Sequence, residues 1–309
     1  MAVCSKNDIA AAMSPFEKHP EMLLRSSDIA CFVANWSDKA TNIRHIAKAL
    51  NIGLEALVFL DDNAFERNLV RTELPMVAVP ELPEEPALYP SRLAEAGYFE
   101  AIAMTVADAE RTGQYRANIE RELLRTTSTD IDAYLRDLGM ELRWAPFDSV
   151  GLQRIVQLIN KTNQFNLTAR RYTEPEVAAL LEDPGILTLQ IRLVDRFGDN
   201  GIIGIVIGRK NGDGDINLDT WLMSCRVIGR GVEKATLNLI VAEARRLGAV
   251  RLIGQYQPTS KNGMVAEHYP SLGFRKREEL ASPEDDFRSW ELALDTFTEH
   301  KAWIEMRKS

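Results

Sequence analysis

The sequence predicts an α/β fold in two parts: a partial parallel-sheet domain that lacks its first strand, followed by a complete mixed α/β domain. Near the start, an amphipathic helix pattern leads directly into an apolar strand pattern, which is typical of β–α–β units. After residue 140, several strand patterns separated by turn residues precede a long amphipathic helix. The 309 residues are enough for two ordinary domains.

The composition is that of a folded, acidic protein. Hydrophobic residues make up 45% of the chain and charged residues 27%, and 37 Lys and Arg against 45 Asp and Glu give a net charge of −8. This balance excludes a general attraction to nucleic acid or to an anionic membrane. The sequence shows neither a secretory leader nor the roughly twenty consecutive apolar residues of a membrane helix. A cytoplasmic location is therefore expected.

Residues 34–63 predict a helix followed by a buried strand. Four apolar residues share one helix face: Ile43, Ile46, Ala47 and Leu50. Gly53 ends the helix, and the apolar run 56–60 leads into Asp61, Asp62 and Asn63. We expect residues 1–4 to be the end of a parallel strand. Ligands of open α/β sheets bind beyond the carboxyl ends of strands, where residues 4–8 and 61–63 would then meet.

A proline-rich connector follows. Five of the 13 prolines fall between Pro75 and Pro90, which predicts extended chain with one short strand at 77–79. Residues 91–138 contain no proline and are helical in composition. The expected division is a partial sheet domain at 1–90, a helical connector at 91–139 and a second domain at 140–309.

The second domain is predicted to contain consecutive antiparallel strands and then a helix that rises from a glycine-rich turn. Helices are expected around residues 152–159, 237–244 and 264–269. Strands are expected at 187–193, 202–207, 216–223, 251–255 and 290–294. Turn residues at 199–201 and 211–214 bound the strand at 202–207.

The turn before the long helix has the character of an anion site. Gly229 and Gly231 let successive N–H groups point at one anion at a helix start, and Arg226 and Arg230 add positive charge. The pattern Arg-x-x-Gly-x-Gly resembles the pyrophosphate loop of GNAT acyltransferases, and residues 266–274 resemble that family's closing helix. The resemblance implies a site for coenzyme A or for the pantetheine arm of a carrier. The residues it points to are Arg226, Gly229, Arg230, Gly231, Asn262 and Tyr269. An ordinary glycine-rich helix start is the alternative.

Asp61 and Asp62 place two adjacent negative charges directly after an apolar run, which suits a shared cation such as Mg2+. Lys39 at a helix start and Ser5 at a strand end are candidates for holding phosphate oxygens. Alone, an Asp-Asp-Asn turn more often caps a helix. A strand-end serine, a helix-start lysine and an Asp pair in this order resemble the second to fourth motifs of haloacid-dehalogenase (HAD) phosphatases.

Four segments together, at residues 3–8, 36–42, 59–63 and 160–168, resemble the FkbH-like family over nearly the whole chain. The resemblance implies a HAD-like domain fused to a GNAT-like domain. It also implies transfer of a glyceryl unit from 1,3-bisphosphoglycerate to the phosphopantetheine thiol of an acyl carrier protein in polyketide-type biosynthesis, with loss of both phosphates. The substrate contacts implied are Lys6, Asn7, Asp8 and Asn63, with Asp61 and Asp62 at the metal and Asp61 also catalytic.

The chain departs from this family in one respect. HAD phosphatases begin with a strand that ends in an Asp-x-Asp-x-Thr type motif, whose first Asp attacks phosphorus, and no such motif occurs in the 309 residues. Residues 213–215 are Asp-Gly-Asp, but they lie in a predicted hairpin turn and are followed by Ile and Asn. The sequence thus predicts a domain truncated at its N-terminal end relative to the family, with one metal ligand missing.

Cys4 is the predicted nucleophile, because a thiolate suits an acyl phosphate and yields a thioester. We expect nearby cations to lower its pKa. Cys225, beside the glycine turn, is the competing nucleophile, although its position also fits a packed thiol at a strand end. Cys31 has apolar neighbours and is predicted to lie in the core. Three widely spaced cysteines indicate neither a disulfide framework nor a zinc site.

Several residues keep two interpretations. His268 is a candidate base, although an exposed helix histidine is favoured. Gln164, Asn166 and Asn262 either bind substrate hydroxyls or the pantetheine amide, or cap loops. Two other functions stay open: a CoA-dependent GNAT N-acyltransferase, suggested by the glycine turn, and a non-catalytic carrier-protein docking module, suggested by the missing Asp.

Overall fold

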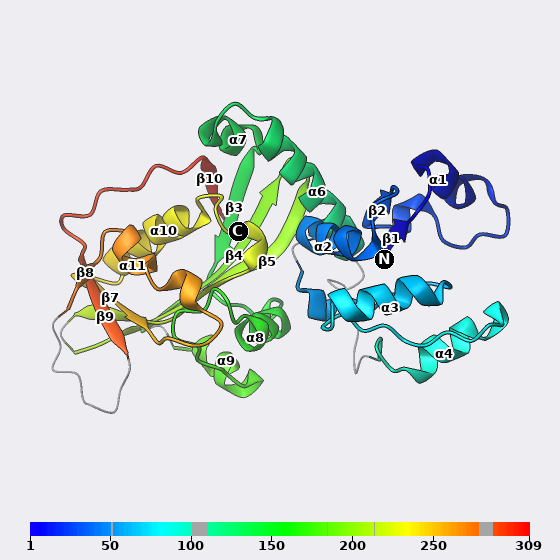
Figure 1. The fold of residues 1–309 in the computed structure, drawn as a ribbon. Helices are drawn as coiled ribbons and strands as arrows, with labels where there is room; N and C mark the ends of the chain where they lie inside the picture. Colours follow the sequence, from blue (N-terminus) through cyan, green and yellow to red (C-terminus); the bar gives the residue numbers. More distant parts are fainter. Residues whose placement is uncertain (51, 101–110, 184, 213, 278–286) are drawn as a thin grey trace. The chain divides into compact units, whose positions relative to one another are not determined.

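A computed structural model describes the chain from residue 1 to 309, with the exception of residues 51, 101–110, 184, 213 and 278–286 (Figure 1). The chain divides into two compact units, Met1–Thr127 and Ser128–Ser309. The predicted connector at 91–139 spans this division, and its residues 101–110 lie outside the described residues. Within the described ranges, no helix has the length and apolar character needed to cross a bilayer.

The first unit begins with a two-stranded parallel sheet. Strand β1 (Ala2–Ser5) pairs with β2 (Cys31–Ala34) in a register that sets Cys4 beside Val33. Helix α1 (Ile9–Lys18) and the 3-10 turn η1 (Ser26–Asp28) connect the two strands. The parallel arrangement and the strand end near residue 4 follow the sequence, whereas β2 was not predicted.

Helix α2 (Lys39–Leu50) presents its apolar face to the core of this unit, as its periodicity predicts. The buried residues of that face are Ile43, Ile46, Ala47 and Leu50. The strand predicted at 56–60 is wrong, because residues 54–56 form the 3-10 turn η2 (Leu54–Ala56). Val58 makes only an isolated parallel bridge to Ala78, so the predicted strand at 77–79 is also reduced to this bridge. Pro80 contributes to the short pairing, since proline has no N–H to donate.

Further elements of the first unit follow within the described residues. They are helix α3 (Ala64–Glu73), the 3-10 turn η3 (Pro86–Leu88), helix α4 (Tyr89–Glu95) and helix α6 (Arg111–Thr127). The side chain of Asn63 caps α3 by accepting a hydrogen bond from the Phe65 N–H at 2.9 Å. Such a cap satisfies one of the free N–H groups at a helix start.

The second unit is built on an eight-stranded mixed sheet with the order β10-β3-β4-β5-β6-β7-β9-β8. Its strands are β3 (Met140–Ala145), β4 (Ile186–Asp195), β5 (Gly198–Lys210), β6 (Asp215–Met223), β7 (Arg251–Tyr256), β8 (Arg275–Lys276), β9 (Arg288–Ala293) and β10 (Ile304–Lys308). The β10–β3 and β6–β7 pairs are parallel and the others are antiparallel. The described chain therefore has the predicted α/β class, with a parallel start and a mixed second part.

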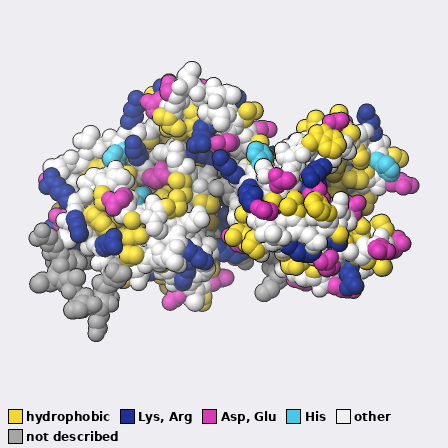
Figure 2. Space-filling model, in the orientation of Figure 1, with side chains coloured by type: hydrophobic (Ala, Val, Ile, Leu, Met, Phe, Trp, Pro, Cys, Tyr) yellow, Lys and Arg dark blue, Asp and Glu magenta, His cyan; other side chains and the backbone are white. Residues whose placement is uncertain are grey.

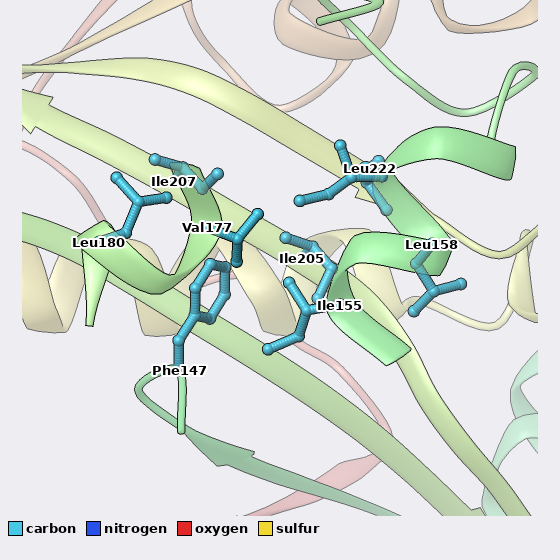
Figure 3. Packing of buried hydrophobic residues seen from close by; sticks show 9 residues of the cluster. Phe147, Ile155, Leu158, Val177, Leu180, Ile205, Ile207 and Leu222 are labelled. Carbon is cyan, nitrogen blue, oxygen red and sulfur yellow. The ribbon is translucent and has the colours of Figure 1, made fainter. Parts of the chain in front are cut away.

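Helices cover this sheet and close its core. They are α7 (Ile131–Asp137), α8 (Leu152–Lys161), α9 (Glu174–Leu180), α10 (Val232–Arg246) and α11 (His268–Ser271), with the 3-10 turns η4 (Cys225–Val227) and η5 (Gly263–Val265). Figure 3 shows side chains of α8 and α9, with Phe147, packed against β5 and β6. Burial of such apolar surface is the main stabilising contribution to a core of this kind.

Two sequence predictions for the second unit need correction, and two strands were missed. Strand β5 begins at Gly198, so the turn predicted at 199–201 lies within the strand. The helix predicted at 264–269 is split into η5 and α11. Strands β3 and β10 were not predicted; β10 is a mostly exposed edge strand whose sequence lacks a clear apolar alternation. Asp213, placed in a hairpin turn by the sequence, lies outside the described residues.

Figure 2 shows the charged side chains on the visible face of each unit. Lys and Arg side chains are interspersed there with Asp and Glu side chains. Mixed charge of this kind agrees with the acidic but not one-sided composition.

Candidate functional site

Cys4, Lys39 and Asp61 lie together at the end of β1. The half-buried Cys4 thiol is 4.0 Å from the Lys39 carbonyl oxygen. Lys39, the first residue of α2, is buried; its Nζ donates to the Cys4 carbonyl oxygen at 2.6 Å and pairs with Asp61 Oδ2 at 3.0 Å. The structure thus brings together three residues that the sequence singled out, while their roles stay predictions.

A second ion pair lies beside the first. Lys6 Nζ contacts Glu66 Oε1 at 2.6 Å, and the Glu66 side chain, in the first turn of α3, is only 9% exposed. The adjacent Arg67 donates from Nη1 to the carbonyl oxygens of Asp61 and Asp62, each at 2.9 Å, so it fixes the Asp-Asp turn to the helix. Sequence reasoning missed Glu66 and Arg67. The sequence did contain an indication of their burial, because both charged residues share a helix face with the apolar Val70, which is buried.

The other predicted substrate contacts in this unit have local partners. Asn7 Oδ1 accepts from the Asp8 N–H at 2.9 Å, and Asp8 Oδ1 accepts from Trp36 Nε1 at 3.3 Å. Ser5 is partly buried and Asp62 is exposed. The Asn63 side chain caps α3, which is the structural alternative that the sequence left open.

Burial changes the expected state of Cys4. It raises the pKa of the thiol to about 11; the positive charge of Lys39 acts in the opposite direction, and the carboxylates of Asp61 and Glu66 raise the pKa further. Lys39 lowers this pKa as predicted, but the net shift is upward, because burial of the thiol outweighs the charge of Lys39 and the nearby carboxylates add to the effect of burial.

The carboxylates at the Asp-Asp turn do not form a magnesium site by themselves. Asp61 Oδ2 pairs with Lys39, and Asp61 Oδ1 accepts a hydrogen bond from the Asn63 N–H at 2.9 Å. Both oxygens of Asp61 therefore have protein partners, and the neighbouring Asp62 is exposed. Across the described residues, no group of three or more His, Cys, Asp or Glu could hold a metal ion. Magnesium is usually bound through carboxylates, waters and substrate phosphates together. A bound Mg2+ therefore stays a prediction.

The glycine turn of the second unit has the predicted backbone shape. Gly229 and Gly231 both have φ near 78°, in the left-handed region that side-chain-bearing residues disfavour, and Gly231 is the N-cap of α10. The Gly229 N–H already donates to Glu233 Oε1 at 3.3 Å. The Arg226 guanidinium donates to Ser224 Oγ at 3.2 Å. A carboxylate of the protein thus lies where the sequence predicts a ligand anion.

Three of the predicted pantetheine contacts have side chains inside the protein. Arg230 is 7% exposed, donates to the Arg226 carbonyl oxygen at 2.6 Å and pairs with the buried Asp195 at 3.4 Å. Asn262 is fully buried and has four hydrogen-bond contacts. Tyr269 is also buried, among aromatic rings. Internal partners occupy the arginine and the amide, which favours the loop-capping interpretation of Asn262.

Residues 165–168, here called the bridging segment, lie between β6 and β7. The β6–β7 ladder runs from Asp215 to Leu218. Beyond it, Leu167 N–H donates to Trp221 O at 3.2 Å and Met223 N–H to Phe165 O at 3.0 Å, while Leu167 O accepts from Gln257 N–H at 2.8 Å. All four residues of the segment are buried. The β6 edge next to the glycine turn is therefore already paired, and it is closed to strand-like pairing with an amide-bearing chain such as pantetheine.

The remaining candidates divide by exposure. Cys225 is exposed, so the packed-thiol interpretation is wrong, whereas Cys31 is buried as predicted. His268 is 7% exposed with its ring edge-on to Trp221, so the expectation of an exposed histidine is also wrong. Burial lowers the pKa of His268 to about 3. Asn166 is buried and accepts from the Ala169 N–H at 3.0 Å, and Gln164 is exposed.

Comparison with known proteins finds a likeness at high identity in the N-terminal part and likenesses at low identity over about half of the chain. No protein-family model and no curated protein matches the chain. The N-terminal part is similar to the crystal structure of the N-terminal part of BF1531 from Bacteroides fragilis, which contains a phosphatase domain complexed with Mg. That match has 55% identity and a TM-score of 0.33, and covers 33% of this chain and 27% of the other.

Two acetyltransferase structures are similar to about half of the chain. The GNAT domain of S. lividans PAT is 19% identical, with 48% of this chain and 89% of that one covered and a TM-score of 0.39. The ribosomal-protein-S18-alanine N-acetyltransferase from Escherichia coli is 15% identical, with 52% and 98% covered and a TM-score of 0.36. At these values the likeness carries no information on activity or ligands. The chain is thus similar to a phosphatase-containing structure in its N-terminal part and to acetyltransferase structures over about half of its length.

Proposed function

We propose that the chain transfers an acyl group from a small phosphorylated donor to the phosphopantetheine thiol of an acyl carrier protein, through a thioester on Cys4. The observation that carries the proposal is the contact between Cys4 and Lys39: the thiol lies 4.0 Å from the Lys39 carbonyl oxygen, and Lys39 Nζ bonds both the Cys4 carbonyl oxygen and Asp61. The finer assignment, a glyceryl unit from 1,3-bisphosphoglycerate in polyketide-type biosynthesis, rests on the resemblance of residues 3–8, 36–42, 59–63 and 160–168 to the FkbH-like family.

The first half of the reaction is attack of Cys4 Sγ on the acyl carbon. A C–S bond forms while the C–O bond to phosphate breaks, and the phosphate leaves with the electron pair and takes up the thiol proton. In the second half, the carrier thiol attacks the thioester carbon, and the Cys4–carbon bond breaks. Cys4 then takes the proton that the carrier thiol releases. Both halves balance without an added reductant or oxidant.

The lysines supply the positive charge that an acyl phosphate needs. Lys6 and Lys39 are each held by one carboxylate, and a phosphate group would compete with those carboxylates for the two ammonium groups. Ser5, Asn7, Asp8 and Asn63 are proposed as further polar contacts to the donor. Asp61 and Asp62 are the residues that would hold a Mg2+, which would supply further positive charge to the donor phosphate. Hydrolysis of the second phosphate is not assigned to a residue, since the sequence lacks the Asp-x-Asp-x-Thr motif.

Intact-mass spectrometry after mixing with 1,3-bisphosphoglycerate tests the proposal. We expect a covalent phosphoglyceryl or glyceryl adduct on the wild-type chain and none on Cys4→Ala. Cys225→Ala is the matched control, because it removes an exposed thiol from the other unit and should leave the adduct unchanged. An adduct that persists in Cys4→Ala would show that Cys4 is not the nucleophile.

A CoA-dependent N-acyltransferase is the second candidate, favoured by the left-handed turn at Gly229 and Gly231 before α10. The paired β6 edge and the inward-facing Arg230 weigh against it. Calorimetric titration with acetyl-CoA separates the two: tight binding followed by acetyl transfer to an amine would favour this candidate. Carrier binding without turnover of any donor would instead support a docking module.

A further inference from the structure

The Glu66 carboxylate has one oxygen with a partner and one without. Oε1 bonds Lys6 Nζ at 2.6 Å, whereas Oε2 is buried and finds no hydrogen-bond donor among the described residues. A buried carboxylate oxygen without a donor has lost its hydration without a replacement, which is unfavourable. Native proteins seldom retain such a group unless a ligand, ion or water completes it. Glu66 is therefore a candidate for contact with something that enters the site.

The position of Glu66 links it to the proposed nucleophile. Its negative charge is one of those that raise the pKa of the Cys4 thiol, so the two groups lie within electrostatic reach of each other. Its ion-pair partner Lys6 is two residues from Cys4 along the chain. Arg67 holds the same helix turn to the carbonyl oxygens of Asp61 and Asp62. These contacts orient the carboxylate before any ligand arrives.

The chemistry of the free oxygen limits what it can bind. An ionised carboxylate only accepts hydrogen bonds, so its partner must present an O–H or N–H group. The neighbouring Lys6 would attract a phosphate. A donor that carries a phosphate and, near its acyl carbon, a hydroxyl group can satisfy both residues at once.

We propose that Glu66 Oε2 accepts a hydrogen bond from the hydroxyl group of a 2-hydroxyacyl phosphate, and that the site thereby selects hydroxylated donors over plain acyl phosphates. This inference rests on the proposed function. It adds a binding residue that the sequence motifs did not indicate and names the feature of the donor that the residue recognises.

The test uses two donors that differ only in the 2-hydroxyl group, lactoyl phosphate and propionyl phosphate. The measured quantity is the rate of adduct formation on Cys4, followed by intact mass. Because a site built to bond a hydroxyl rejects the analogue that lacks it, we expect lactoyl phosphate to react about 10- to 100-fold faster with the wild-type chain. In Glu66→Ala the rate with lactoyl phosphate should fall until the two rates agree within about threefold.

Two further variants keep the test interpretable. Glu66→Gln retains the size of the side chain and replaces Glu66→Ala in the test if that variant is poorly folded. Its preference for lactoyl over propionyl phosphate should be lower than that of the wild type. Glu81→Gln is the matched control, since Glu81 is likewise a carboxylate in ion pairs, with Arg67 and Arg71, but is 71% exposed. The donor preference of this variant should equal that of the wild type. Equal wild-type rates, or a preference that survives in Glu66→Ala, would overturn the inference while Cys4 adducts still support the proposed function. If 1,3-bisphosphoglycerate gives a Cys4 adduct and neither of these donors does, the inference fails while the proposed function stands; if none of the three gives an adduct, both fail.

Discussion

The two predicted ligand sites differ in what their polar side chains contact. Around Cys4, Lys6 and Lys39 each pair with a single carboxylate, next to a half-buried thiol. At the glycine turn, Arg230 and Asn262 are bonded to neighbouring loops and strands. A sequence motif thus predicts the local conformation of the backbone. Whether the side chains of the motif can contact a ligand depends on their partners elsewhere in the chain.

This contrast has an energetic side. An ion pair can exchange one partner for a ligand phosphate, because both interactions are charge-assisted. A fully buried amide with four hydrogen-bond contacts cannot change partners without leaving several buried groups unsatisfied. We therefore expect substitutions at the first site to affect chemistry as well as stability, and substitutions at the second to affect stability alone.

The largest expected effect is that of Lys39→Met, which tests the first half of the contrast. Removing one partner of a buried ion pair leaves Asp61 uncompensated, and we expect a loss of about 3–5 kcal/mol in the free energy of unfolding, measured with urea. The double variant Lys39→Met with Asp61→Asn should recover most of that loss but form no Cys4 adduct. If adduct formation survives in the double variant, Lys39 does not serve the chemistry.

Asn262→Ala tests the second half. The truncation leaves the carbonyl oxygens of Asn166 and Gln257 without their donor, which should cost about 2–4 kcal/mol of stability. Cys4 adduct formation in the folded variant should match that of the wild type. A variant of normal stability that has lost carrier or CoA binding would instead make Asn262 a ligand contact and remove the contrast.

The pH dependence of Cys4 sharpens the contrast. The pKa of this thiol is raised from 9.0 to about 11, so the reactive thiolate fraction increases with pH through the range in which an ordinary thiol has already ionised. The rate of Cys4 alkylation by iodoacetamide, mapped by peptide mass, should rise about tenfold per pH unit from 7 to 10. A plateau below pH 9 would contradict the raised pKa.

Gly231→Ala carries the smallest expected effect. At φ 78° an alanine is strained even though its Cβ meets no atom within 4 Å, so a loss of about 1 kcal/mol is expected. Gly263→Ala is the control, because its added Cβ is equally free and its φ lies outside the left-handed region. Equal melting temperatures for the two variants would show that the turn geometry contributes little.

Much of the fold follows from patterns in the sequence. Periodicity and turn residues predicted the buried face of α2, the long helix α10 and strands β4 to β7. These elements were predictable because the residues that define each of them are close together in the sequence. The strand at 56–60 was wrong because an apolar run does not specify pairing when its partner is short and followed by Pro80. Edge strand β10 was missed because its exposure removes the apolar alternation.

The candidate site was predictable in its composition and not in its electrostatics. The sequence placed Cys4, Lys39 and Asp61 together because strand ends and a helix start meet at one edge. It could not show that Glu66, 60 residues from Lys6, would neutralise that lysine, nor that Arg230 would pair with Asp195, 35 residues away. Such partners depend on tertiary packing, which leaves no local pattern.

The bridging segment also bears on how the second unit is made. Thr168 bonds a residue 51 positions later, and Asn166 bonds Asn262 at a separation of 96. Contacts of such long range form late and slow the folding of a domain. During synthesis from the N-terminal end, Phe165 and Leu167 can pair with β6 once residue 223 has left the ribosome. The bonds of this segment to Gln257 and Asn262 form only after those residues have emerged, so the segment completes its pairing in two steps.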